Sequence, residues 1–323
     1  MRVLVTGGSG FIGTNLIQEL LKHNHTVVNL DIRPPQIEAH RSLWHELSIL
    51  DEQGTAQLLQ EFQPSYVIHA AARTDLNGKS LEEYAVNTTG THNLIQAMQA
   101  AGSVKRAILF SSMLVCRNGY RPTCNTEYLP DTAYGKSKAQ MEVIVRQCMG
   151  PTGMEFVLVR PTSVWGPWFS EPYKQFFQMI RRGLYVHPGH RPVKKHFAYV
   201  GNLVDQTLKL LTASSQECTG QVFYLGEYTE YIVAQWAELI QKEFCAKPIR
   251  TVPLPVLKLI AWTGDRLVSL GWQRVPLTTF RLSNMLMNNS LSFDNSERVF
   301  GALRYSISDG VRKTVAWLNE HNP

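Results

Sequence analysis

The sequence predicts an α/β protein: a doubly wound parallel sheet followed by a smaller, discontinuous C-terminal lobe. Three observations lead to this prediction. Short apolar runs alternate with longer helical patterns through the first half of the chain, a glycine-rich turn joins the first run to the first helical pattern, and the second half loses the alternation. Alternating strands and helices of this size form βαβ units, which place helices on both faces of a parallel sheet.

Five short runs rich in Val, Ile, Leu or Phe are the predicted buried strands of this sheet. They lie at residues 2–6, 26–31, 66–71, 106–111 and 155–160, and a weaker strand is expected within 43–49. The segments between the runs carry apolar residues at helical spacing. The predicted helices are 11–22, 53–62, 80–101 and 132–149.

The second half of the chain has fewer clear strands. Residues 165–196 are rich in proline, aromatic and basic residues, whereas 221–226 is predicted to be a strand. Helices are expected at 201–212, 231–244 and 308–321. We expect a main domain at 1–165 and a smaller lobe formed mainly by 166–323, with 197–226 returning to the main domain.

Charge and composition exclude several classes of protein. Lys and Arg outnumber Asp and Glu by 32 to 26, which gives a formal net charge of +6 with no run of five basic residues. This pattern favours a small anion such as a diphosphate as the partner, and not a nucleic acid. No stretch reaches the roughly 18–20 apolar residues of a membrane-spanning helix. Met1 and Arg2 lead directly into the first predicted strand, so a signal peptide is not expected.

Cysteine and histidine usage points away from metal and disulfide chemistry. The five cysteines are odd in number and show no CxxC spacing, so neither a disulfide scaffold nor a zinc knuckle is expected. The ten histidines show no metal-ligand spacing, so no metal site is predicted, and His69 is expected to be a core histidine. These features fit a reducing compartment, and we expect a cytoplasmic location.

The first predicted strand is joined to the first predicted helix by a turn with the spacing GxxGxxG, made by Gly7, Gly10 and Gly13. In that position the first glycine permits a sharp turn, the second lets the backbone approach a pyrophosphate, and the third lets the helix pack close to the sheet. The helix N-terminus offers free N–H groups to the phosphates. The turn therefore predicts a Rossmann-type domain, with residues 1–165 binding a dinucleotide and the C-terminal lobe binding the substrate.

An acidic residue, Asp31, ends the second predicted strand. A carboxylate at this place accepts hydrogen bonds from the adenosine ribose diol and repels a 2′-phosphate, which favours NAD over NADP. Arg33 complicates this prediction, because an arginine can pair with a 2′-phosphate. NADP therefore remains possible.

A YxxxK pair lies in the predicted helix 132–149, with Tyr134 and Lys138 on one helix face. Tyrosine exchanges protons poorly at neutral pH, because its reference pKa is about 10. The ammonium of Lys138 and a positively charged nicotinamide would lower that pKa and let Tyr134 act as acid and base. Ser111 and Ser112 end the preceding strand, and Ser112 is expected to hydrogen-bond the same substrate oxygen.

Together these motifs resemble those of extended short-chain dehydrogenases/reductases of the NAD-dependent epimerase/dehydratase family. The resemblance covers essentially the whole chain, and its motifs are TGGSGFIG at 6–13, VIHAAA at 67–72, VNTTGTHNL at 86–94, FSS at 110–112, YxxxK at 134–138, RPTSVWGP at 160–167 and FAYVGNLV at 197–204. Members mostly act on nucleotide sugars. The resemblance therefore implies an NAD(P)-dependent enzyme with a nucleotide-sugar substrate.

The resemblance also implies roles for individual residues. The cofactor-binding residues would be Gly7, Gly10, Phe11, Ile12, Gly13, Asp31, Arg33, Ser48, Ile49, Ala70, Ala71, Ala72, Asn87, Ser111, Tyr134, Lys138, Pro161 and Val164. The catalytic set would be Ser112, Tyr134 and Lys138. The substrate-binding residues would be Arg73, Thr74, Ser112, Arg191 and Lys195. Lys195 stands where the family often has an arginine that grips the substrate diphosphate.

Two departures from the family pattern bear on function. Ser48 and Ile49 stand where an aspartate often meets the adenine, so adenine contacts would be weaker or made by the backbone. Met113 and Leu114 follow the catalytic serine, where the 4,6-dehydratase branch has the Asp-Glu pair that eliminates water. Two apolar side chains cannot transfer protons, so a dehydratase of that type is not expected.

The expected reaction is hydride transfer at one carbinol carbon of the sugar, C4, with Tyr134 as acid and base. An epimerase, a 4-keto-sugar reductase and a dehydrogenase need the same active-site residues, so all three remain open. A small-alcohol or steroid dehydrogenase of the same family is a further alternative, as is a non-catalytic dinucleotide sensor. Family analogy implies a homodimer.

Overall fold

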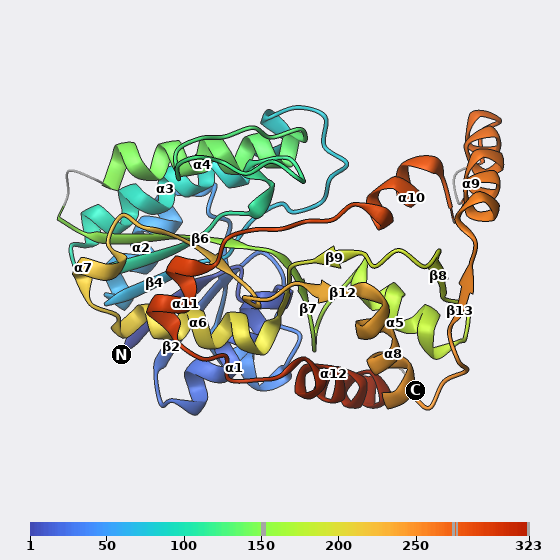
Figure 1. The fold of residues 1–323 in the computed structure, drawn as a ribbon. Helices are drawn as coiled ribbons and strands as arrows, with labels where there is room; N and C mark the ends of the chain where they lie inside the picture. The colour runs from blue at the N-terminus through green and yellow to red at the C-terminus, as the bar shows by residue number, and fades with distance from the viewer. Residues whose placement is uncertain (150–152, 273–274, 276, 322–323) are drawn as a thin grey trace. The chain divides into compact units, whose positions relative to one another are not determined.

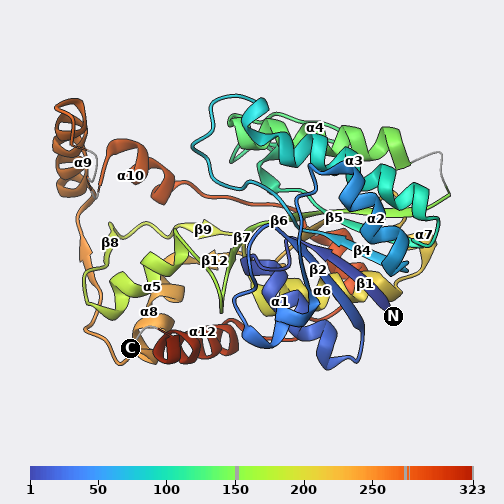
Figure 2. The same cartoon turned by 180° about the vertical axis from the view of Figure 1, so that it is seen from behind.

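The computed structural model describes residues 1–149, 153–272, 275 and 277–321, and the chain divides into two compact units (Figures 1 and 2). Unit 1 contains Met1–Phe169, Ala198–Tyr228 and Ser292–Arg304. Unit 2 contains Ser170–Phe197, Thr229–Leu291 and Tyr305–Pro323. Each unit is therefore formed by three segments of the chain. The sequence-based prediction placed the first boundary at residue 165 and the return to the main domain at 197–226.

Unit 1 is built on a seven-stranded sheet with the order β11-β6-β5-β4-β1-β2-β3. Its strands are β1 (Arg2–Thr6), β2 (Thr26–Asp31), β3 (Trp44–Glu46), β4 (Tyr66–His69), β5 (Arg106–Phe110), β6 (Glu155–Pro161) and β11 (Val222–Leu225). The neighbouring pairs in this sheet are parallel. The strand order reverses direction on either side of β1, so the doubly wound parallel sheet predicted from the sequence is confirmed.

Helices cover both faces of this sheet (Figure 1). On one face α2 (Glu52–Phe62), α3 (Ala85–Ala101) and α4 (Ala133–Met149) pack side by side, and on the other α1 (Phe11–Lys22) packs against α6 (Val200–Thr212). Apolar residues of the strands and of α2–α4 form one continuous buried cluster. The shorter elements of the unit are η1 (Glu38–Leu43), η2 (Glu82–Tyr84), η3 (Met113–Val115), β7 (Ser163–Trp165), α7 (Ser215–Cys218) and α11 (Asp294–Phe300).

Two predicted elements are shorter in the structure. The helix expected from residue 80 begins as the 3-10 helix η2 at Glu82 and becomes α-helical at Ala85. The Tyr84 hydroxyl accepts from Gly78 N and donates to Asp75 O, and these bonds tie the preceding loop to η2. The strand expected to reach residue 71 ends at His69, although Ala70 N still donates to the carbonyl of Thr6 in β1 at 3.1 Å.

Unit 2 has its own core of aromatic side chains. Its helices are α5 (Tyr173–Arg181), α8 (Val233–Glu243), α9 (Leu254–Ser269), α10 (Thr279–Leu286) and α12 (Ile307–His321). Its short strands are β8 (Val186–Pro188), β9 (Lys194–Lys195), β12 (Tyr231–Ile232) and β13 (Arg250–Val252), and β10 (Phe197–Tyr199) lies where the chain leaves the unit. The Trp236 ring lies 5.0 Å from Phe176 and 5.6 Å from Tyr231 between ring centroids. Among the described residues, no helix is both long and apolar enough to cross a membrane.

Candidate functional site

The residues predicted to act together follow the carboxyl ends of five strands of unit 1. Since the strands are parallel, these ends meet at one edge of the sheet. The glycine turn follows β1, Asp31 ends β2, the alanine loop follows β4, and Ser111 and Ser112 follow β5. Pro161 ends β6. The fold therefore brings the predicted cofactor end and the predicted catalytic set to the same edge.

Two glycines of the turn, Gly7 and Gly13, leave no room for a side chain. Gly7 has φ of 71°, and a Cβ there would lie 2.6 Å from the backbone nitrogen of Ala71. A Cβ on Gly13 would lie 2.2 Å from the carbonyl oxygen of Gly7. Helix α1 begins after Gly10 with no side-chain cap, so the first backbone N–H groups, from Phe11 onward, are available to an anion. This part of the chain fits a dinucleotide pyrophosphate.

The Asp31 carboxylate is fixed beside that turn. One of its oxygens accepts from Ser9 N and the other from Arg33 N, both at 3.0 Å. The carboxylate therefore has a defined orientation and keeps lone pairs for a further donor such as a ribose hydroxyl. The Arg33 side chain is exposed.

Behind the alanine loop, His69 lies in a chain of buried hydrogen bonds. Thr91 Oγ1 donates to the carbonyl of Asn87, so it accepts from His69 Nε2 at 2.9 Å. His69 Nδ1 then accepts from Thr6 Oγ1 at 2.7 Å. Burial lowers the pKa of His69 to about 3, so the ring is neutral. His69 is the satisfied core histidine predicted from the sequence.

Two of the three predicted catalytic residues are in contact, and the third lies one helical turn further along α4. Tyr134 and Lys138 are buried, and the Tyr134 side chain hydrogen-bonds with Ser112. Ser112 Oγ also accepts from Leu114 N at 3.1 Å, which fixes its position at the start of η3. Lys138 Nζ donates to the carbonyl of Phe110 at 2.7 Å. The side chains are therefore held by the backbone of β5 and η3.

Burial dominates the ionisation of this pair. It raises the pKa of Tyr134 to about 12, against the opposing effect of the hydrogen bond with Ser112. It lowers the pKa of Lys138 to about 8, although the nearby Glu142 carboxylate opposes this shift. The sequence-based expectation was a lowered tyrosine pKa. In the protein without cofactor, desolvation outweighs the hydrogen bond with Ser112, so Tyr134 is a neutral phenol at pH 7.

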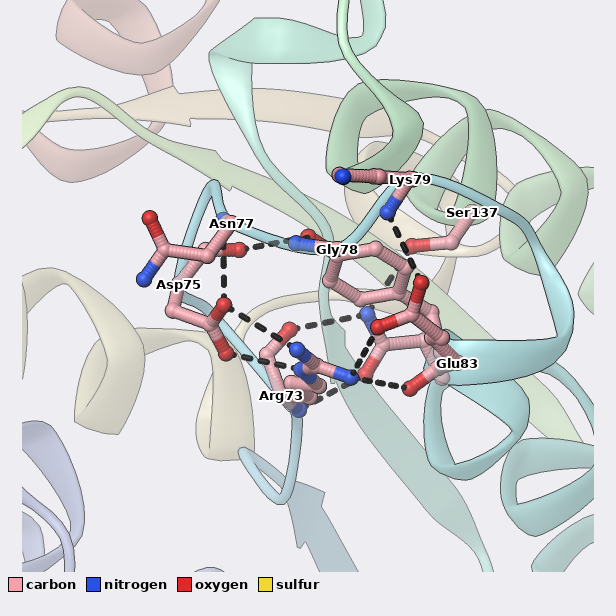
Figure 3. Close-up of polar contacts among 9 residues, drawn as sticks. Arg73, Asp75, Asn77, Gly78, Lys79, Glu83 and Ser137 are labelled. Atoms are coloured by element: carbon pink, nitrogen blue, oxygen red, sulfur yellow. Dashed lines mark hydrogen bonds and ion pairs between the residues drawn. The ribbon is translucent and has the colours of Figure 1, made fainter. Parts of the chain in front are cut away.

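Arg73, predicted to touch substrate, is held within its own loop (Figure 3). Its guanidinium pairs with Asp75 at 2.8 Å and with the Glu83 carboxylate at 3.2 Å, and it lies over the Tyr84 ring. The amide of Asn87 exchanges two hydrogen bonds with the Arg73 backbone and donates to Ser137 Oγ, as Figure 3 shows in part.

This network links the loop to α4. The two carboxylates raise the pKa of the Arg73 guanidinium, so its positive charge is already paired within the loop. Thr74, the other predicted substrate contact of the loop, is exposed.

Other predicted residues are placed less centrally. Ser48 Oγ accepts from Leu50 N at 3.2 Å, and the Ile49 side chain belongs to the buried core. Val164 is half-buried in β7. Arg191 and Lys195 belong to unit 2, where Arg191 is exposed and Lys195 Nζ donates to the carbonyl of Asn284 at 2.7 Å. Burial lowers the pKa of Lys195.

Comparison with known proteins agrees with this geometry. The family model described as "NAD dependent epimerase/dehydratase family" matches residues 3–226. The chain belongs to this family. Its sequence is 26% identical to N-acetyl-alpha-D-glucosaminyl-diphospho-ditrans,octacis-undecaprenol 4-epimerase of Escherichia coli O157:H7, over 98% of this chain and 94% of that protein.

Two further proteins similar to this chain differ in the substrates that their names give. The chain is 29% identical to 3 beta-hydroxysteroid dehydrogenase/Delta 5-->4-isomerase of Mycobacterium tuberculosis, over 85% of this chain and 76% of that protein. The crystal structure of UDP-glucose 4-epimerase from Thermotoga maritima with UDP-glucose matches the whole of both chains with a TM-score of 0.77 and 21% identity. The latter likeness is one of fold.

NAD is the cofactor of this family, and the residues of this family member fit it. The uncapped N-terminus of α1 suits the pyrophosphate, and the oriented carboxylate of Asp31 suits the ribose diol. NAD would supply the site with a hydride acceptor and donor.

Sequence reasoning missed a buried ion pair next to the predicted catalytic residues. Glu142 lies one turn after Lys138, and its carboxylate accepts from Arg160 Nε and Nη2, both at 2.8 Å. Both side chains are fully buried. Glu142 also accepts from Ser111 Oγ at 2.5 Å and from Tyr128 Oη at 3.1 Å. The i, i+4 spacing of Tyr134, Lys138 and Glu142 was the available signal.

Proposed function

We propose that this protein is an NAD-dependent epimerase or oxidoreductase that acts on a nucleotide-activated sugar by hydride transfer at a carbinol carbon, C4. The observation that carries the proposal is the buried Tyr134–Ser112 contact beside Lys138, at the sheet edge where the dinucleotide turn lies. A dinucleotide sensor needs the glycine turn but no buried proton-transfer group. A catalytic function accounts for both the turn and the buried tyrosine.

In this proposal Tyr134 Oη exchanges a proton with the sugar hydroxyl, and Ser112 Oγ hydrogen-bonds the same oxygen. Lys138, whose position is set by the Phe110 carbonyl, contributes positive charge that stabilises the phenolate form. Ser111 supports this set through Glu142. Bound NAD would supply the hydride acceptor and donor, and the chain's own residues would move only the proton.

The remaining predicted residues take binding roles in the proposal. Gly7, Gly10, Phe11, Ile12, Gly13, Asp31, Arg33, Ser48, Ile49, Ala70, Ala71, Ala72, Asn87, Pro161 and Val164 line the cofactor. Arg191 and Lys195 would bind the substrate diphosphate, and Arg73 and Thr74 would border the sugar. We place the reaction in the cytoplasm and expect a homodimer formed through α3 and α4.

The proposal does not include 4,6-dehydration. Met113 and Leu114 form η3 directly after Ser112, and neither side chain can donate or accept a proton there. The chemistry is then confined to one carbon.

A second candidate substrate is a sugar joined through a diphosphate to a polyprenol, as in the name of the Escherichia coli relative. The specific observation in its favour is the set of exposed apolar side chains on α9 and α10. A steroid or other apolar alcohol is the third, from the Mycobacterium tuberculosis relative. All three would use the same tyrosine.

A substrate panel distinguishes these candidates. The purified protein would be incubated with nucleotide sugars, a polyprenyl-diphosphate sugar and a steroid alcohol, each with no added cofactor, with NAD and with NADPH. We expect a nucleotide sugar to be converted to its C4 epimer without added cofactor, by NAD retained from expression. A requirement for NADPH would identify a reductase. Turnover of the steroid alone would overturn the nucleotide-sugar proposal.

Asp31→Asn is expected to shift cofactor preference. The amide oxygen can still accept from Ser9 N, but the negative charge that repels a 2′-phosphate is gone, so affinity for NADP should rise about tenfold and that for NAD should fall. Fluorescence titration with both cofactors measures the ratio. The control is Glu46→Gln, because Glu46 ends β3 beside Asp31 in the sheet and is exposed. An unchanged ratio in Asp31→Asn would remove Asp31 from the site.

A further inference from the structure

Exposed apolar side chains are concentrated in α9, α10 and the segment between them. In the described part of the chain, more than half of the large apolar side chains that are exposed lie between residues 256 and 287. They are Val256, Leu259, Ile260, Trp262, Val268, Leu270, Trp272, Phe280, Met285 and Met287. Such concentration in 32 residues is unlike the scattered apolar exposure of an ordinary surface.

Helix α9 is apolar on the face that should be polar. Its inner face carries Leu257, Ala261 and Gly264, which are buried against α10 and its approach. Leu259 and Trp262 occupy the opposite face and are 63% and 51% exposed. Large apolar side chains exposed on the face away from the helix's own core mark a surface that another body covers.

The charges of this segment are almost all positive. Residues 254–291 contain four basic residues and one acidic residue, Asp265. Asp265 accepts from the backbone N and the hydroxyl of Thr279, and these hydrogen bonds link α9 to α10. Arg266 lies over the Trp262 ring at 5.1 Å, and Lys258 is exposed on the next turn towards the N-terminus. Cations therefore lie among the exposed apolar side chains.

We propose that α9 docks this protein on an anionic membrane surface, with Leu259 and Trp262 on its outer face entering the interface and Lys258 and Arg266 on the same face meeting lipid phosphates. Apolar, indole and basic side chains on one surface suit the boundary between acyl chains and anionic headgroups.

The geometry favours a bilayer over a second copy of the chain, since self-association through this face would bring like charges together. The 16 residues of α9 rise about 24 Å, less than the hydrocarbon thickness of about 30 Å, so the helix lies in the interface and does not span it.

Vesicle sedimentation tests the docking, using the full chain. Vesicles of phosphatidylcholine alone are compared with vesicles containing phosphatidylglycerol, at low and high salt. The test variants are Leu259→Asp and the charge reversal Lys258→Glu/Arg266→Glu. The matched control is Leu184→Asp, because Leu184 is also 63% exposed in unit 2 but lies outside α9 and α10. Circular dichroism and NAD binding confirm that each variant is folded.

We expect the protein to sediment with the anionic vesicles, to be released by salt, and to lose at least tenfold in partitioning in both test variants but not in Leu184→Asp. The proposal is overturned if the protein sediments with neither vesicle, or if Leu184→Asp loses as much as Leu259→Asp. It is also overturned if the protein is a dimer that Leu259→Asp converts to a monomer without any vesicle binding, since a second copy would then cover this face. The substrate does not enter the test.

Discussion

Tyr134→Phe should bind NAD as the unaltered protein does and lose between about 10²- and 10⁴-fold in kcat, the range typical of a general acid–base. The substitution removes only the hydroxyl of a buried ring that packs 6.1 Å from Tyr84, so the packing of α4 is kept. Steady-state turnover and NAD titration measure the two effects separately. Full activity in this variant would refute the proposed acid–base role of Tyr134.

The same residue gives a spectroscopic prediction. Burial raises the pKa of Tyr134 to about 12, so the phenolate absorbance of the cofactor-free protein should lack this tyrosine until strongly alkaline pH. Binding of oxidised NAD brings a positive charge and should lower that pKa. The wild-type minus Tyr134→Phe difference spectrum reports it. Tyr185 is the matched control, because burial also raises its pKa to about 12 but it lies in unit 2.

Because ionisation of Tyr134 is linked to folding, the stability of the protein changes with pH over the range of this titration. An unfolded tyrosine ionises near pH 10, whereas folded Tyr134 holds its proton to about 12. Its contribution to stability is therefore complete below pH 10 and is lost as pH rises towards 12. Spectra should be recorded directly after a pH jump. A difference spectrum that NAD leaves unmoved would contradict the proposed acid–base role.

Arg160→Leu is expected to lower the free energy of unfolding by about 3–5 kcal/mol, because it leaves the fully buried Glu142 carboxylate without its cation. The lost contacts include two hydrogen bonds to Glu142 and one from Arg160 Nη2 to the carbonyl of Asn125. Urea unfolding at pH 7 measures the loss.

A double-mutant cycle separates the pair from its packing. Glu142→Met/Arg160→Leu removes both charges and should recover much of the stability lost in Arg160→Leu. The control is Arg312→Leu, which breaks the exposed Arg312–Asp309 pair and should cost much less stability than Arg160→Leu. Equal losses in Arg160→Leu and Arg312→Leu would contradict the assigned burial. Turnover of the double variant shows whether Ser111 and Lys138 keep their positions without the pair.

Much of the fold was predictable because its signals are local. Apolar runs at strand spacing, helical periodicity and a glycine turn between them depend on residues that are neighbours in sequence, and they predicted the parallel sheet correctly. The helix 80–101 was predicted too long, because its first turn forms the 3-10 helix η2 and the α-helix begins at Ala85. The alignment of Tyr134 with Lys138 was also local, because four residues make one turn.

By itself, the sequence determined which residues are present for chemistry: a dinucleotide turn, an acidic strand end, and a Tyr, Lys and Ser in the right order along the chain. Only the tertiary structure decided their state. Burial keeps Tyr134 protonated to strongly alkaline pH and lowers the pKa of Lys138, the loop fold pairs Arg73 with two carboxylates, and the core encloses Arg160 with Glu142. Desolvation and pairing depend on what surrounds a group in space, and part of those surroundings comes from residues distant in sequence, as Arg160 lies 18 positions from Glu142.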